Sequence, residues 1–147
     1  MTTPEAILRS LIAKLAPEDQ KLFRSVRTTL RKHAPAANEL LYDYGHSLVI
    51  TYTATEHGKD GVLALSAKAD GLRLYFNQWR RLKDPKKLLQ GSASQVRFIK
   101  LESARQLAQP DLKVLITAAV AGLPSKGRGK LLDRSAAQQA RRRKGAK

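Results

Sequence analysis

The fold is decided by residues 71–102, which read GLRLYFNQWRRLKDPKKLLQGSASQVRFIKLE. At the start of this stretch Leu72, Leu74 and Phe76 alternate with polar or amphipathic residues, a period of two that is typical of a strand with one buried face. Residues 95–101 are rich in β-favouring side chains and predict a second strand. The stretch therefore predicts two strands joined by a long basic insertion.

Two more strands and three helices are predicted around this stretch. Residues 47–55 and 62–69 alternate in the same way, and the short turns between successive strands force antiparallel pairing. Apolar residues at helical spacing, each run opened by an early proline, predict helices over residues 4–15, from residue 17 to Pro35, and from Pro110 to residue 122.

Two other segments have weaker patterns. We expect residues 38–44 to be a connector with at most one helical turn. Within the basic insertion, Pro85 suits the first position of a short helix through Leu88 and Leu89, and Gly91 suits its end.

The order of these elements predicts an α+β domain, with an antiparallel sheet of four or more strands and helices packed on one face. Residues 1–123 form this domain, and 147 residues are enough for one core. From residue 124 the composition shifts to glycine, lysine, arginine, alanine and glutamine. Residues 131–143 could form a helix, but Leu131 and Leu132 are its only large apolar residues. We therefore expect residues 124–147 to be a basic, flexible C-terminal arm.

Charge is the main functional signal. The chain carries a formal net charge of +16, and residues 126–147 hold nine basic side chains against Asp133. Such a balance attracts nucleic acid and other polyanions, although it also serves solubility. The candidate polyanion-binding residues are the arm's cations Lys126, Arg128, Lys130, Arg134, Arg141, Arg142, Arg143 and Lys144. On the sheet, Arg73 and Tyr75 offer one cation and one stacking group, although a single aromatic side chain on a strand usually serves packing.

Several other classes are disfavoured by what the sequence lacks. The chain has no cysteine, which removes disulfides and thiolate metal sites. Arg9 and Lys14 interrupt the apolar run that a signal peptide would need, and no stretch is long enough to span a bilayer, so we expect a cytoplasmic protein. No nucleophile elbow, zinc-protease or dinucleotide-binding motif is present, so we expect a binding domain without a cofactor rather than an enzyme.

The chain resembles the YdhG-like family, small bacterial domains of largely unknown function with a frataxin-like α+β fold. The resemblance covers about residues 17–122. It is carried by the second helix running into Pro35, by Glu39 with Tyr44-Gly45, by Lys68, by Leu74-Tyr75-Phe76, by Leu82-x-Asp84-Pro85-x-x-Leu88-Leu89-x-Gly91, and by Arg97 and Leu101. It implies a candidate cleft formed by Glu39, Tyr44, Lys68, Trp79 and Arg97. An enzymatic site would require Glu39, Tyr44, Lys68 and Arg97 to converge.

The departures from the family's pattern bear on function. Ala93-Ser94 stand where the family commonly has Gly-Lys, and Phe98 stands where it has histidine, so a polar pair is missing. One member is described as a frataxin-type iron chaperone, a role that needs surface carboxylates. Here the first two helices offer only the acids Glu5, Glu18 and Asp19 among seven basic residues, and Asp43 with His46 lacks a third metal ligand.

The leading interpretation is an uncharacterised domain that binds a polyanion, such as nucleic acid, through its basic arm. The alternatives are frataxin-like iron handling and a protein-partner-binding module. Trp79 beside Arg80 and Arg81 would anchor a protein partner, unless it closes the end of the core.

Overall fold

A computed structural model describes residues 3–124 and 126–135, and it contains three α-helices and one six-stranded sheet within them. The helices are α1 (Pro4–Ile12), α2 (Pro17–His33) and α3 (Pro110–Val120). The strands are β1 (Asn38–Asp43), β2 (Ser47–Thr53), β3 (Gly61–Lys68), β4 (Gly71–Asn77), β5 (Val96–Leu101) and β6 (Leu131–Asp133). Short 3-10 turns η1 (Gly58–Asp60), η2 (Trp79–Arg81) and η3 (Ala104–Ala108) lie between them.

Local sequence signals explain where the helices begin and end. Each α-helix has proline in its first turn, where the missing N–H costs no hydrogen bond. The Thr3 hydroxyl accepts a hydrogen bond from the Ala6 N–H at 3.1 Å and caps α1. Helix α2 ends at His33, two residues before Pro35, and buries Phe23, Val26 and Leu30. These apolar stripes are the surfaces that pack on the sheet.

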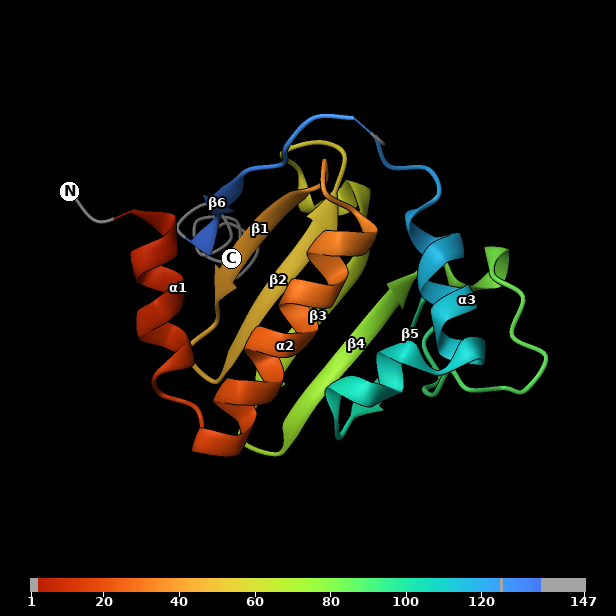
Figure 1. Cartoon of the computed structure of the whole chain (residues 1–147), viewed down its shortest axis with the longest axis horizontal. Helices are drawn as coiled ribbons and strands as arrows, with labels where there is room; N and C mark the ends of the chain where they lie inside the picture. The colour runs from red at the N-terminus through yellow and green to blue at the C-terminus, as the bar shows by residue number, and fades with distance from the viewer. Residues whose placement is uncertain (1–2, 125, 136–147) are drawn as a thin grey trace, which may run out of the picture.

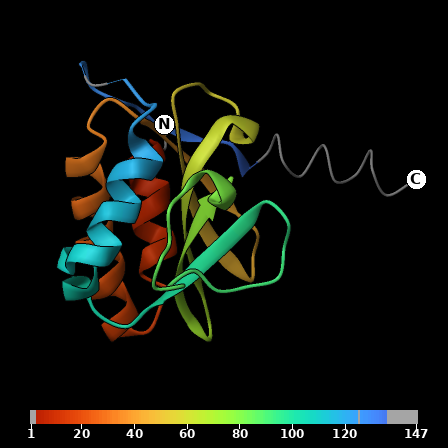
Figure 2. The ribbon, with the colours of Figure 1, turned by 90° about the vertical axis from the view of Figure 1, so that its right-hand side faces the viewer.

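The sheet confirms the predicted α+β class. Its strand order is β5-β4-β3-β2-β1-β6, and every pair is antiparallel except β1 with β6. Figure 1 shows α2 crossing the sheet diagonally with α1 and α3 on either side of it. The view in Figure 2 places all three helices on one side of the sheet. The opposite face is therefore free of helices among the described residues.

The register of the strands determines which residues lie on each face of the sheet. Glu39, Tyr52, Leu63, Phe76 and Arg97 are directly opposed across β1 to β5, so they share the helix-covered face. The next row, one residue away along each strand, consists of Leu40, Thr51, Ala64, Tyr75 and Phe98 and lies on the opposite face. The large apolar side chains of the first face and the helices form the core.

Two local predictions are wrong. Residues 38–43 form β1 rather than a connector, because Leu40, Leu41 and Tyr42 are all buried and the strand lies inside the sheet. The short helix expected after Pro85 does not form. The two Asp84 carboxylate oxygens instead accept the N–H groups of Leu88 and Leu89 at 2.8 and 2.9 Å, and this turn competes with a helix.

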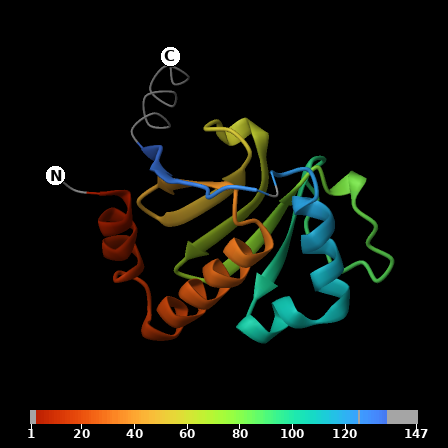
Figure 3. The same cartoon turned by 45° about the horizontal axis from the view of Figure 1, so that its top comes forward.

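The predicted flexible arm is wrong for residues 129–135, because they are tied to the edge of the sheet. Figure 3 shows the segment after α3 crossing the end of the sheet to reach β6 beside β1. The Glu39 N–H donates to the Lys130 carbonyl at 2.8 Å, and the Arg134 N–H donates to the Leu41 carbonyl at 2.8 Å. Backbone pairing of this kind needs little apolar burial, which is why composition alone favoured a free arm. Residues 136–147 of the predicted arm lie outside the described residues.

None of the helices in the described ranges has the length and apolar character that crossing a membrane requires.

Gly129 provides a test of the β6 contact. A Cβ at Gly129 would overlap the carbonyl oxygen of Ala37, whereas a Cβ at Gly122 would meet open space. We expect Gly129→Ala to lower the free energy of unfolding by about 1–3 kcal/mol, as overpacking does, and Gly122→Ala to leave it nearly unchanged. Denaturant unfolding measures both values. Hydrogen exchange at the Glu39 amide, which should speed up only in Gly129→Ala, shows whether β6 has detached; equal protection in the two variants would contradict the assignment.

Candidate functional site

The five residues of the candidate family cleft do not lie together. Glu39 and Arg97 stand in one row of the sheet but four strands apart, a separation of about 19 Å at the usual strand spacing. Lys68 lies five residues along β3 from that row, about 17 Å away, and pairs with Ser47 at the other end of the sheet. Trp79 and Arg97 are in direct contact. Glu39, Lys68 and Arg97 therefore do not converge in one cleft.

Tyr44 and Lys68 lie near the same end of the sheet. Tyr44 stacks on Tyr42 with ring centroids 5.9 Å apart, and its N–H donates to the Ser47 carbonyl. Lys68 lines a surface pocket that also contains Asp19, Asp43 and His46. No group of three or more histidine and carboxylate side chains in the described residues could hold a metal ion there or elsewhere.

Glu39 is the centre of a buried polar network. Arg27 on α2 donates from Nε to Glu39 Oε2 at 2.9 Å and from Nη2 to Oε1 at 2.8 Å, a bidentate pair. The Tyr52 hydroxyl donates to Oε2 at 2.8 Å, and Arg31 approaches Oε1 at 3.8 Å. Both carboxylate oxygens are thus engaged inside the fold, so Glu39 ties α2 to β1 and β2 rather than facing a ligand.

The network also sets its members' ionisation. Burial is the largest cause that raises the pKa of Tyr52 well above its usual 10.0, and the neighbouring Glu39 carboxylate adds to it. Arg27 has a second acid, Glu5 on α1, whose carboxylate accepts from Nη2 at 3.0 Å. That hydrogen bond is the main reason the pKa of Glu5 is lowered, and the Glu39 and Glu5 carboxylates together raise the pKa of Arg27 despite its burial.

The basic insertion is organised around the chain's one tryptophan. Trp79 is half-buried against the core, and its indole Nε1 donates to the Ser94 carbonyl at 3.1 Å. The Arg97 guanidinium lies 4.1 Å from the centre of the Trp79 ring, and Arg80 lies 5.8 Å from it. Trp79 therefore partly closes the end of the core, and two arginine side chains lie over its ring; its role as an anchor for a protein partner stays a prediction.

The insertion exposes positive charge. Five basic side chains are exposed between Trp79 and Leu88, namely Arg80, Arg81, Lys83, Lys86 and Lys87. Lys86 pairs with Asp111 at 3.0 Å, while Asp84 is engaged by backbone N–H groups.

A second cationic surface lies on the open face of β4 and β5, where sequence reasoning had found only Arg73 and Tyr75. In the register of the two strands Arg73 is opposite Lys100, and Tyr75 is opposite Phe98. We call these four side chains the sheet-face patch. Phe98 and Lys100 were missed because their relation to β4 depends on the strand register, which the alternation of each strand does not reveal.

The arm's candidate residues fall into two groups. Lys126, Arg128 and Lys130 are exposed, and Arg134 is half-buried where its backbone pairs with β1. Arg141, Arg142, Arg143 and Lys144 lie outside the described residues.

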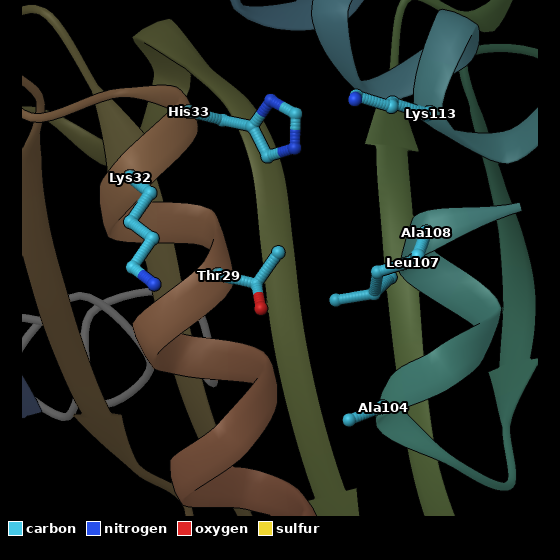
Figure 4. Close-up of a pocket in the computed structure, with 7 residues that line it drawn as sticks. All are labelled: Thr29, Lys32, His33, Ala104, Leu107, Ala108 and Lys113. Atoms are coloured by element: carbon cyan, nitrogen blue, oxygen red, sulfur yellow. The ribbon is translucent and has the colours of Figure 1, made fainter. Parts of the chain in front are cut away.

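Figure 4 shows a pocket between α2 and the η3–α3 region. Thr29 and His33 of α2 point across it toward Leu107 and Lys113, and Lys32 and Ala108 also line it. Burial and the nearby Lys113 charge lower the pKa of His33, in that order of importance. The pocket has cations at its rim and no carboxylate among its lining residues, but Lys32 and Lys113 are both solvent-exposed.

The buried network gives a stability prediction with an internal control. Glu39→Gln removes the charge that Arg27 faces, and both side chains are largely buried, with relative exposures of 6% and 13%. We expect the free energy of unfolding to fall by about 3–5 kcal/mol, as when one partner of a buried pair is removed. Arg31→Gln removes a half-exposed cation from the same carboxylate and should cost about 1 kcal/mol or less. Equal losses of unfolding free energy in the two variants would contradict a buried Glu39–Arg27 pair at the centre of the network.

The raised pKa of Tyr52 predicts a loss of stability in alkali. The neutral phenol stabilises the fold fully below the unfolded-state pKa of about 10, and this contribution is lost as pH rises above 10 through the raised folded pKa. Above pH 10 the wild-type unfolding free energy should therefore fall more steeply than that of Tyr52→Phe. Parallel pH profiles for the two proteins would contradict the buried, hydrogen-bonded phenol.

Comparison of the chain with protein-family models, with curated proteins and with solved structures found no match, so the resemblance to the YdhG-like family stays a prediction.

Proposed function

We propose that this protein is a non-enzymatic domain that binds nucleic acid as a polyanion, through exposed cations of the basic insertion and of the C-terminal arm. The observation that carries the proposal is uncompensated positive charge. Within the described residues, four basic side chains lie within 4.0 Å of a carboxylate, namely Arg27, Arg31, Arg73 and Lys86. The other described cations have no carboxylate within that distance, in a chain with net charge +16.

The distribution of the acids strengthens this proposal. Arg27 engages two carboxylates, Glu5 and Glu39, so two of the chain's twelve acids are already paired inside the molecule. Asp84 is occupied by two backbone N–H groups. These acids do little to offset the exposed lysines and arginines, and the surface left to a ligand attracts phosphates.

The same arrangement disfavours iron handling. Glu5, one of three acids on the first two helices, is held by Arg27, and Glu39 is buried beneath them. Hard cations require several oxygen ligands without competing positive charge. A nucleic-acid ligand fits the charge better, and it agrees with the cytoplasmic location expected from the sequence.

The proposal predicts steeply salt-dependent binding that depends on particular cations. Full-length protein is titrated into fluorescein-labelled DNA across a range of salt concentrations, with anisotropy as the readout. Neutralising Arg141, Arg142, Arg143 and Lys144 to glutamine should weaken binding and reduce the salt slope by about one unit per lost phosphate contact. Neutralising Arg80, Arg81, Lys83 and Lys87 should act in the same direction.

The control neutralises four exposed cations on α1, on α2 and in the turn between them, namely Arg9, Lys14, Lys21 and Arg24, and should change the slope least. Wild-type binding without salt dependence would refute the proposal. If the control variant bound DNA as weakly as both test variants, the assignment of the binding surface would be refuted.

A further inference from the structure

We propose that the sheet-face patch binds the bases of single-stranded nucleic acid, with Tyr75 and Phe98 as the stacking side chains and Arg73 and Lys100 as the phosphate contacts. This inference rests on the proposed function. It specifies that the polyanion is single-stranded, and it names a surface that contacts the bases as well as the charged backbone. It adds a site on the folded sheet to the cations of the insertion and the arm.

The patch is a two-by-two arrangement fixed by the register of β4 and β5. Tyr75 and Phe98 are directly opposed, with ring centroids 5.6 Å apart and planes inclined by 47°. Arg73 and Lys100 are the next opposed pair on the same face, about 7 Å away along the strands. Aromatic and cationic pairs therefore lie side by side on a surface that no described helix covers (Figure 2).

The cationic pair is unfavourable for the fold itself. Like charges directly opposed across two strands destabilise a sheet. The acid that the structure places near Arg73 is Asp70, at 3.8 Å and largely exposed, and Lys100 has no carboxylate within ion-pair distance among the described residues. A local arrangement that opposes stability is expected where a ligand supplies the missing negative charge.

Short side chains and a cation lie around Tyr75 on this face. Its partner on β3 is Ala64, and Arg73 is opposite Ser66, so the neighbouring strand presents short side chains. On the other side the Arg73 guanidinium lies 4.4 Å from the centre of the Phe98 ring, which joins cation and aromatic surface into one face. Both side chains are half-buried.

Single-stranded nucleic acid is the ligand that this chemistry fits. In a duplex the faces of the bases are stacked inside the helix, whereas a single strand can lay them on aromatic side chains of an open sheet. The cations beside the rings match the backbone charge of that same strand. A peptide could also contact the rings, but the opposed cations and the chain's net charge of +16 favour a polyphosphate backbone.

The test compares three probes on the full-length protein. They are a short labelled single-stranded oligonucleotide, the same sequence as a duplex, and inorganic polyphosphate, which has the charge without bases. The wild type should bind the single strand more tightly than the duplex at equal salt. Tyr75→Leu keeps an apolar side chain but removes the ring, and it should weaken single-strand binding about five- to 150-fold, the usual range for one lost stacking contact.

Matched variants separate stacking from charge and from folding. Tyr75→Phe keeps the ring and should restore single-strand affinity, while polyphosphate affinity should be the same in wild type, Tyr75→Leu and Tyr75→Phe. Arg73→Gln with Lys100→Gln should weaken binding of both the oligonucleotide and polyphosphate. Thermal melting confirms that each variant is folded, and Lys21→Gln with Arg24→Gln on α2 is the matched charge control for the opposite side of the sheet.

The outcomes distinguish this inference from the function on which it rests. If all three probes bind with steep salt dependence and Tyr75→Leu changes none of the affinities, the sheet-face site is refuted and general polyanion binding stands. If Tyr75→Leu lowers the affinity for the oligonucleotide and for polyphosphate equally, base stacking is also refuted. If the wild type binds none of the probes, both proposals fail.

Discussion

The buried carboxylate of Glu39 is the constraint on which the rest of the structure depends. A charge inside a core is tolerated only where partners replace its lost hydration, and Arg27 and Tyr52 occupy both of its oxygens. Glu39 and these two partners come from β1, α2 and β2, so the network sets where α2 crosses the sheet. Arg27 also reaches Glu5 on α1. The same contacts that fix the helices bury Glu39 and pair Glu5, whereas most of the chain's described cations stay exposed.

Successive residues along each strand of the sheet face either the core or the proposed binding surface. The row that starts at Glu39 faces the helices and contains the polar network and large apolar side chains. The adjacent row ends in Tyr75 and Phe98 on the face without helices. Because opposed residues always share a face, a shift of one residue in the pairing of β5 would bury Phe98 and separate it from Tyr75. The apolar core thus holds the sheet-face patch in register.

Sequence periodicity predicted the helices and β2 to β5, where one face is buried and apolar residues recur at a clear spacing. It failed at β1, because Leu40 and Leu41 face opposite sides and are both fully buried. It failed at β6, because three residues held mainly by backbone pairing have no pattern to detect. For the candidate site, motif residues such as Glu39 and Lys68 could be identified, but their separation depends on strand order. Phe98 with Lys100 could be recognised only from the pairing of β5 with β4.

The strand order also places the basic segments around the open face. Strand β6 fixes the start of the C-terminal arm at the β1 edge, whereas the basic insertion returns along the opposite edge, where Gln90 pairs with Phe98 of β5. The two edges are five strand spacings apart, about 24 Å. A polyanion that contacts cations at both edges can pass from one edge to the other over the helix-free side, which is the shorter route. On this route it crosses the open face, where the sheet-face patch lies. Contacts at the edges would then raise the local concentration of bases at Tyr75 and Phe98, so weak stacking contacts gain from the stronger attraction of the edges.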